Sequence, residues 1–212
     1  MVVPLRALAA VGAHPGSRPG VAVFRNGVPM SAIETMYHGR LYRSILEARW
    51  QCFFDLLGWR TEYEAITLDG YIPDFLARFH KPMLIEVKGI SDFSDLYEHT
   101  KKIDDSGWPH EALLVGSMWG DGWDYKDRPA IGLLKEKSQA AEADNWSEAI
   151  FHKCAQCKQY SFCHSEWSYR CRVNGCYDGD GLLCGAPMWP SFWNQAGNIT
   201  RWTPVSRRKI AT

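Results

Sequence analysis

The sequence predicts an α/β fold with a mixed sheet, followed by a small cysteine-rich β module. Apolar residues recur at helical spacing between residues 44 and 58, and three short apolar runs follow between residues 61 and 88. A second helical segment then leads to the apolar run 112–115. The order helix, three strands, helix, strand is typical of an α/β layer. Six of the seven cysteines lie between Cys154 and Cys184, after this layer.

Length and charge set the first limits. The 212 residues suit one ordinary domain and a small appendage, and 46% hydrophobic with 23% charged residues is a globular composition. Residues 1–150 hold 16 Lys and Arg against 21 Asp and Glu, whereas residues 151–212 hold 8 against 3. Either the surface charge is merely uneven, or the basic C-terminal part contacts phosphate.

The N-terminal residues do not have the layout of a signal peptide, because Arg6 interrupts a mildly apolar run. No stretch approaches the roughly 20 apolar residues of a membrane helix. We therefore expect a cytoplasmic protein. Residues 1–40 carry several prolines and glycines without periodicity, so they are expected to form a loosely structured arm.

The first helix is predicted to begin at Ser44, which forms an S-x-x-E capping-box pattern with Glu47. Gly58 is a natural stop. Between them four apolar residues share one helical stripe. They are Leu46, Trp50, Phe53 and Leu57.

Three strands are predicted next, over Thr61–Leu68, Tyr71–Phe79 and Met83–Lys88. Asp69-Gly70 is a turn pair between the first two strands, and His80-Lys81-Pro82 connects the last two. The second and third strands are therefore expected to form a hairpin.

The remaining segments have a weaker pattern. We expect a helix over about Asp92–Asp105, a buried strand at Ala112–Val115, a surface loop over Ser117–Pro129 and a short strand at Ile131–Leu134. The polar, Ala-rich stretch Lys135–Asn145 is expected to be a short helix or a linker.

The predicted organisation therefore has four parts. Residues 1–40 are the arm, 41–135 the α/β core, 136–150 a linker or short helix, and 151–212 the cysteine-rich module with a basic, aromatic tail.

Three charged residues are expected to converge on the hairpin. Glu86 and Lys88 are two residues apart on a strand, so they point to one face, while Ile85 and Val87 point to the other. A turn of two to four residues would pair Asp74 with Glu86, Val87 or Lys88. Asp74 should therefore lie within a residue of the other two charged groups.

Such a cluster has a clear chemical use. Two carboxylates on neighbouring strands can hold a hard cation such as Mg²⁺, which activates a bound water. Lys88 could position that water and offset charge in the transition state. Glu47, on the flank of the helix stripe, could add a further, water-mediated metal contact. The alternative is structural: an E-x-K strand face is often merely solvated, and Glu47 could be only the capping-box acid.

The segments Ile72-Pro73-Asp74-Phe75 and Ile85-Glu86-Val87-Lys88 resemble the signature of the PD-(D/E)XK nuclease superfamily. Glu47 matches the acidic residue that many members carry on the preceding helix. Tyr42–Val115 follows the superfamily's core order, about a third of the chain. The stretch from Tyr42-Arg43-Ser44 to Lys88 looks most like the endonuclease subunit of certain cut-and-paste transposons, and like small phage proteins.

This resemblance implies a restriction-endonuclease-like core and a Mg²⁺- or Mn²⁺-dependent reaction on DNA. Asp74 and Glu86 would bind the metal with the help of the Val87 carbonyl, and Lys88 would orient the attacking water. Products would carry 5′-phosphate and 3′-hydroxyl ends.

The cysteine-rich module predicts a metal site. Cys154-Ala-Gln-Cys157 and Cys171-Arg-Val-Asn-Gly-Cys176 are two short pairs separated by 13 residues, and two such knuckles supply four thiolates to Zn²⁺. The arrangement resembles a zinc ribbon, with an iron–sulfur cluster as the rival. The remaining cysteines and one histidine have other expected roles. Cys163, His164 and Cys184 are reserve ligands, and Cys52 is expected to be core.

Basic and aromatic residues surround this module. They either grip and stack on nucleic acid or form a packing seam against the core. The basic residues are Lys153, Lys158, Arg170, Arg172, Arg201, Arg207, Arg208 and Lys209. The aromatic residues are Trp167, Tyr169, Trp189, Trp193 and Trp202, and Trp119, Trp123 and Tyr125 have the same two interpretations.

The first functional hypothesis is therefore a metal-dependent endodeoxyribonuclease, with RNA as a less favoured substrate. The second is a non-catalytic nucleic-acid-binding or assembly factor on a nuclease-like scaffold. A third is a subunit that is active only in a recombination or transposition assembly. Double-strand cleavage would favour a homodimer, because each active site cuts one strand.

Overall fold

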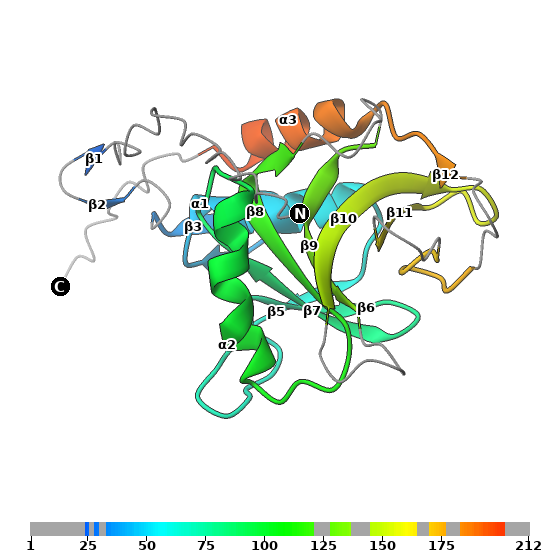
Figure 1. Ribbon diagram of the computed structural model, residues 1–212. Helices are drawn as coiled ribbons and strands as arrows, with labels where there is room; N and C mark the ends of the chain where they lie inside the picture. The colour runs from blue at the N-terminus through cyan, green and yellow to red at the C-terminus, as the bar shows by residue number, and fades with distance from the viewer. Residues whose placement is uncertain are drawn as a thin grey trace, which may run out of the picture.

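The computed structural model describes residues 24–25, 28–29, 33–120, 128–136, 145–164, 170–176 and 183–201. These residues form an α/β protein with three α-helices and an eight-stranded mixed sheet (Figure 1). The strands of the sheet are β5 (Thr61–Tyr63), β6 (Phe75–Arg78), β7 (Pro82–Val87), β8 (Ala112–Gly120), β9 (Ala130–Glu136), β10 (Asn145–Cys154), β11 (Tyr160–His164) and β12 (Leu183–Cys184).

The helices are α1 (Ile45–Leu56), α2 (Thr100–Asp104) and α3 (Trp189–Ile199), and the 3-10 helix η2 (Ser94–His99) directly precedes α2. Two short ribbons complete the described elements. They are β1 (Phe24–Arg25) with β2 (Val28–Pro29), and β3 (Thr35–Tyr37) with β4 (Arg40–Tyr42).

The sheet is mixed, as expected. Its strand order is β11-β10-β9-β8-β7-β6-β5, and β12 pairs with β10 beside this path. The pair β7–β8 is parallel, and the other described pairs of the sheet are antiparallel. A parallel pair requires a crossover, which here runs through η2 and α2. The expected order helix, three strands, helical segment, strand is therefore confirmed.

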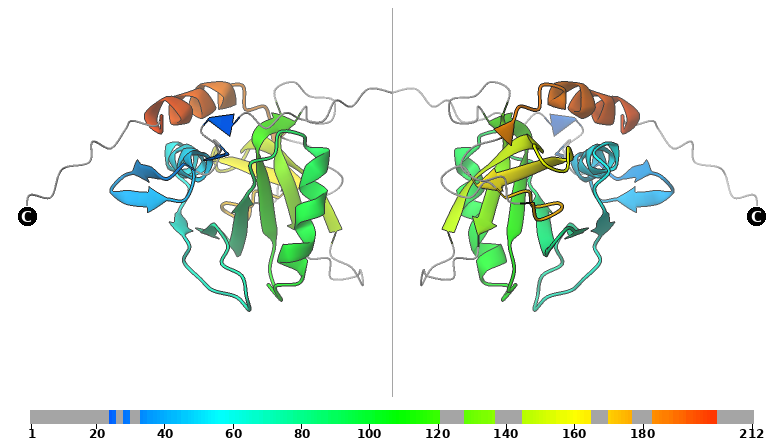
Figure 2. Two further views of the ribbon diagram at one scale, coloured as in Figure 1. Left: turned by 90° about the vertical axis from the view of Figure 1, so that its left-hand side faces the viewer. Right: turned by 90° about the vertical axis from the view of Figure 1, so that its right-hand side faces the viewer.

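Helices cover both faces of the sheet. In Figure 1, α2 lies in front of the strands and α1 behind them, and α3 runs above (Figures 1 and 2). Side chains on the sheet alternate accordingly. Ile85 and Leu113 belong to the core under α1, whereas Leu84 and Leu114 belong to the core under α2. Among the described residues, none of the helices has the length and apolar character needed to span a membrane.

The predicted start and stripe of α1 are confirmed. The Ser44 hydroxyl accepts a hydrogen bond from the Glu47 backbone at 3.1 Å, so it caps the helix. Trp50 and Phe53 are fully buried. The indole of Trp50 donates to the Gly116 carbonyl at 3.0 Å, which fixes α1 on β8.

The two ends of the strand order meet through side chains. Trp59, which precedes β5, donates from its indole nitrogen to the Tyr160 carbonyl on β11 at 2.9 Å. The ring centroid of Phe162 on β11 lies 5.5 Å from Trp59 and 6.0 Å from Phe79. The sheet therefore curls around the aromatic core that α1 fills, and the cysteine-bearing strands pack against the hairpin β6–β7.

Several predicted elements differ in extent. The strands expected at Thr61–Leu68 and Tyr71–Phe79 are shorter, because Glu64 has a left-handed φ of 48° that ends the ladder. The turn at Asp69-Gly70 is confirmed: Leu68 and Tyr71 exchange both backbone hydrogen bonds across it, at 2.7 and 3.1 Å.

Three local predictions are wrong in part. The helix expected over Asp92–Asp105 is a 3-10 helix followed by the five-residue α2. Part of the expected arm, residues 35–40, forms β3 and begins β4, because Thr35 and Tyr37 are buried and anchor them. Residues 117–120 of the expected surface loop extend β8, and residues 121–127 lie outside the described residues.

The linker or short helix expected over residues 136–150 is wrong for residues 145–150, which begin β10. The reason is that Ser147 and Ala149 are buried, so this polar-looking stretch is half of a strand between β9 and β11. The strands that carry the cysteines therefore continue the same sheet.

Candidate functional site

The hairpin β6–β7 brings the predicted charged residues together. Its register pairs Phe75 with Ile85, which puts Asp74 opposite Glu86, as expected from the turn length. Ile85 and Val87 are buried on the opposite side, also as expected. Glu86 and Lys88 share a face, and Lys88 Nζ lies 2.5 Å from Glu86 Oε1.

Each of the two carboxylates has one oxygen tied to the protein. Asp74 Oδ2 accepts a hydrogen bond from the Val87 backbone nitrogen at 2.8 Å. Glu86 Oε2 accepts from the Tyr71 hydroxyl at 2.7 Å and from the Asp74 backbone nitrogen at 3.4 Å. The Asp74 and Glu86 side chains are only 5% and 4% exposed. Their orientation is therefore set by the strands rather than by solvent.

The second oxygen of each carboxylate faces a cation. Arg43 Nη2 lies 2.5 Å from Asp74 Oδ1, and Lys88 Nζ forms an ion pair with Glu86 Oε1. Lys102 Nζ, from α2, lies 3.8 Å from the same Glu86 oxygen and 4.4 Å from the centre of the Tyr71 ring. Tyr71 and Lys102, which both contact Glu86, also line a surface pocket.

Burial and neighbouring charges change the pKa of Asp74. Burial, the negative charge of Glu86 and, more weakly, that of Glu47 raise the pKa of Asp74 to about 7, although the Val87 hydrogen bond and Arg43 oppose this. Four carboxylates and three cationic side chains make up the cluster. The carboxylates are Glu47, Glu64, Asp74 and Glu86, and the cations are Arg43, Lys88 and Lys102. With all of these groups ionised, the cluster carries one net negative charge.

Glu47 belongs to this cluster, and both of its side-chain oxygens accept hydrogen bonds. The Ser44 hydroxyl donates to Oε1 at 3.0 Å, and the Tyr63 hydroxyl donates to Oε2 at 2.5 Å. Arg43 Nε lies 3.8 Å from Oε2. The capping role is therefore real, and a metal role stays a prediction. A metal contact of the Val87 carbonyl also stays a prediction.

The sequence prediction missed four residues at the site, which are Arg43, Glu64, Tyr71 and Lys102. Arg43 precedes the cap residue Ser44, which was a usable signal, since a residue there lies at the start of the helix that carries Glu47. Tyr71 lies three residues before Asp74 but outside the expected motif. Lys102 could not be placed, because the helix expected over residues 92–105 is a 3-10 helix followed by the short α2.

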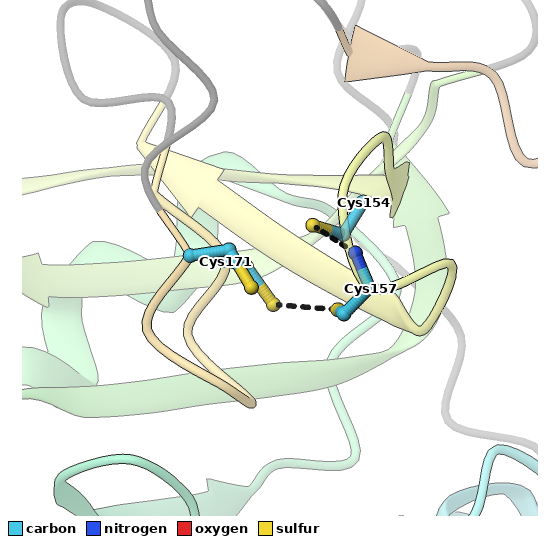
Figure 3. Close-up of side chains that lie close together, drawn as sticks. Cys154, Cys157 and Cys171 are labelled. Carbon is cyan, nitrogen blue, oxygen red and sulfur yellow. Dashed lines mark hydrogen bonds between the residues drawn. The ribbon is translucent and has the colours of Figure 1, made fainter.

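The four predicted cysteines form a second cluster. Figure 3 shows three of them, Cys154, Cys157 and Cys171. The sulfur atoms of Cys154, Cys157, Cys171 and Cys176 all lie within 4.8 Å of one another. The two Sγ atoms of Cys157 and Cys171 are 3.8 Å apart. Four thiolates at about 2.3 Å from one tetrahedral ion would be about 3.8 Å apart. The cluster could therefore bind Zn²⁺.

Both cysteine turns share one backbone form. The residue three positions after each first cysteine donates its N–H to that thiol sulfur, from Cys157 to Cys154 at 3.5 Å and from Asn174 to Cys171 at 3.4 Å. The next residue, Lys158 or Gly175, has φ of 62° or 72° and closes the turn on the first cysteine's carbonyl. The wider second spacing therefore keeps the same turn and takes its second ligand two positions later.

Hydrogen bonds within the four-cysteine cluster also change the pKa of the Cys157 thiol. Burial opposes ionisation of Cys157, but hydrogen bonds from the Gln159 backbone, Asn174 and neighbouring thiols outweigh it and lower its pKa to about 7. A thiol that ionises easily is a better zinc ligand, since zinc binds the thiolate.

The reserve ligands have other places. Cys163 and His164 lie on β11, outside the four-cysteine cluster. Cys184 is in β12, and its side chain lies outside the described residues. Cys52 is fully buried in α1, so its assignment to the core is confirmed.

For the described aromatic residues, the packing interpretation is confirmed. Trp119 stacks on Trp189 with ring centroids 4.4 Å apart, and Trp193 packs on Trp50 at 4.7 Å. Arg172 is also no surface contact for a phosphate, because its side chain is 3% exposed and pairs with Glu136 at 2.9 Å. The phosphate contacts expected of Lys153, Lys158, Arg170 and Arg201 stay predictions. The remaining expected contacts lie outside the described residues. These are Trp123, Tyr125, Trp167, Tyr169, Trp202, Arg207, Arg208 and Lys209.

Comparison with known proteins adds no assignment: no family model, curated protein or solved structure matches this chain.

Proposed function

We propose that this chain is a metal-dependent nuclease that hydrolyses phosphodiester bonds of DNA. The observation that carries the proposal is the pair of buried carboxylates, Asp74 and Glu86, with Lys88 at 2.5 Å from the second. Two buried carboxylates repel each other, and in the metal-free protein Arg43 and Lys88 offset this repulsion. A divalent cation bound by both carboxylates would also offset that repulsion, because carboxylate oxygens are ligands of hard cations.

The residues present fit a hard cation. Asp74 Oδ1 and Glu86 Oε1 are held by the side chains of Arg43 and Lys88 and by no backbone group or tyrosine, so a metal could take them by displacing these cations. Mg²⁺ or Mn²⁺ bound there would supply Lewis acidity and a water of lowered pKa. Lys88 would then donate a hydrogen bond to the attacking water, giving 5′-phosphate and 3′-hydroxyl products.

DNA as the substrate rests on the resemblance of the Ile72–Phe75 and Ile85–Lys88 segments to PD-(D/E)XK nucleases. The four-cysteine centre would hold Zn²⁺ and help to place the substrate. Action as a homodimer, or within a recombination or transposition assembly, is part of the same proposal.

The test incubates the purified chain with linear, nicked, branched and single-stranded DNA in Mg²⁺, Mn²⁺ or EDTA. Asp74→Asn and Lys88→Ala should each lower the cleavage rate by about a hundredfold or more. Arg78→Gln is the matched control, because Arg78 is an exposed cation that pairs with Glu62 outside the cluster. It should cleave at the wild-type rate.

Two outcomes would contradict the proposal. Cleavage that persists in EDTA, or in both site variants, would remove the metal site from the reaction. Metal-independent DNA binding without cleavage of any substrate would favour the alternative, a non-catalytic binding or assembly factor.

A further inference from the structure

Arg43 occupies a special position in the carboxylate cluster. It lies one residue before the cap of α1, and its side chain is 56% exposed while the carboxylate that it contacts is 5% exposed. Its Nε lies 2.9 Å from Glu64 Oε1 and 3.3 Å from the Tyr63 hydroxyl. The guanidinium therefore bridges the buried site and its solvent side.

The oxygen that Arg43 contacts is the one that a metal would need. Asp74 Oδ2 is held by the Val87 backbone, so Oδ1 is left for a ligand, and Arg43 Nη2 lies 2.5 Å from it. A guanidinium keeps its charge at every accessible pH. A divalent ion at Oδ1 must therefore displace Arg43, and like charges would keep the two apart.

A displaced Arg43 has a suitable new partner in the substrate. Its planar fork of donors matches the oxygens of a phosphodiester, and half of its side chain already reaches solvent. Lys88 is not available to bind this phosphate, because in the proposed function it donates a hydrogen bond to the attacking water. Lys102 is a single ammonium and lies 3.8 Å from Glu86 Oε1, so it has no planar fork of donors.

We propose that Arg43 is a phosphate-binding residue of this site, held by Asp74 in the metal-free protein and transferred to a backbone phosphate of the substrate when a divalent ion binds Asp74. This inference rests on the proposed function and adds to it a competition between one arginine and the metal. Arg43 then favours DNA binding only after the metal is in place.

The first measurement is Mn²⁺ binding by calorimetry in the absence of DNA. Arg43→Gln should bind Mn²⁺ several-fold more tightly than the wild type, because a competing cation is gone. Arg78→Gln is the matched control: Arg78 is 51% exposed and forms a bidentate pair with Glu62 away from the cluster. It should leave Mn²⁺ affinity unchanged. Melting curves establish that both variants are folded.

The second measurement is binding of a short linear duplex in Mn²⁺, with Lys88→Ala in every protein so that cleavage does not interfere. Arg43→Gln should lower DNA affinity about tenfold, and the plot of log affinity against log salt should lose about 0.9 of its slope, the value for one phosphate contact. Arg43→Lys keeps the charge, so it should keep the slope while losing part of the affinity.

Unchanged or weaker Mn²⁺ binding by Arg43→Gln, with an unchanged salt slope, would overturn the inference and make Arg43 only a support for Asp74. Asp74→Asn separates this from failure of the proposed function. If Asp74→Asn abolishes Mn²⁺ binding while Arg43→Gln behaves like Arg78→Gln, only the inference fails. If wild type and Asp74→Asn bind Mn²⁺ equally poorly, both fail.

Discussion

The imidazole ring of His80 lies so close to Gly175 that a Cβ atom on this glycine would be 2.5 Å from the Cγ of His80. The backbone nitrogen of His80 also donates to the Val173 carbonyl at 2.8 Å. His80 forms the turn between β6 and β7, and Gly175 closes the second cysteine turn. The four-cysteine centre therefore supports the hairpin that orients Asp74 and Glu86.

Replacing Gly175 by alanine should destabilise the protein for two reasons. Gly175 has a φ of 72°, and the new methyl group would overlap the His80 ring. Gly107→Ala is the matched control, since its φ is 69° but nothing lies within 4 Å of its Cβ position. We expect a loss of about 1–2 kcal/mol from the left-handed backbone in both variants. Gly175→Ala should lose about 1–3 kcal/mol more from overpacking.

Urea unfolding of the zinc-loaded protein measures both free energies. Equal losses in the two variants would mean that His80 moves away freely, and that the contact between the hairpin turn and the cysteine turn has no energetic weight.

Removal of the four-cysteine metal is expected to lower thermal stability. Cys157→Ser should purify without zinc, because four sulfur atoms within 4.8 Å of one another fit a single ion. Cys163→Ser is the control, since Cys163 is buried on β11 outside the cluster, and it should retain a single zinc ion. Elemental analysis and melting curves check this.

An iron signal with a brown chromophore in the wild type would contradict the zinc assignment. Loss of zinc from Cys163→Ser while Cys157→Ser keeps it would contradict the ligand set.

The hairpin could be predicted from the sequence because two local signals agree. Alternation puts Ile85 and Val87 in the core and Glu86 opposite them, and the short turn at residues 80–82 restricts the register. A one-residue slip would move Ile85 and Val87 out of the core under α1 and turn Glu86 into it, so burial and turn length together set the geometry of Asp74 and Glu86.

The rest depends on contacts that no local pattern encodes. Residues 145–148 are polar enough to resemble a linker, and only their pairing with β9 makes them a strand. The contact between His80 and Gly175 joins segments that lie far apart in the chain. Arg43 was visible as part of a motif, but its position over Asp74 Oδ1 depends on how α1 packs on the sheet.

Glu47 is expected to matter more for stability than for metal binding, because both of its oxygens already accept hydrogen bonds. Glu47→Gln should lower the free energy of unfolding by about 1–3 kcal/mol, since a buried hydrogen-bonded carboxylate is lost. It should reduce cleavage less than Asp74→Asn does. Unfolding curves and cleavage rates of the two variants give the comparison.

Tyr63→Phe isolates the donor to Glu47 and should cost a similar amount of stability. Tyr42→Phe is its control, because the Tyr42 ring lies 4.5 Å from the Tyr63 ring in the same aromatic cluster. If Glu47→Gln abolishes cleavage as fully as Asp74→Asn and leaves stability unchanged, Glu47 is a metal ligand after all.

Removing the charge of Arg172 should strongly lower the free energy of unfolding, because this side chain is buried. Its side chain is 3% exposed and lies 3.0 Å from a Glu111 oxygen and 2.9 Å from a Glu136 oxygen, so it fastens the second cysteine turn to the central strands. Arg172→Met leaves two carboxylates without their cation and should cost about 3–5 kcal/mol. Arg78→Met breaks an exposed pair with Glu62, which should cost about 1 kcal/mol or less. Equal losses in urea unfolding would show that burial of Arg172 does not govern its contribution.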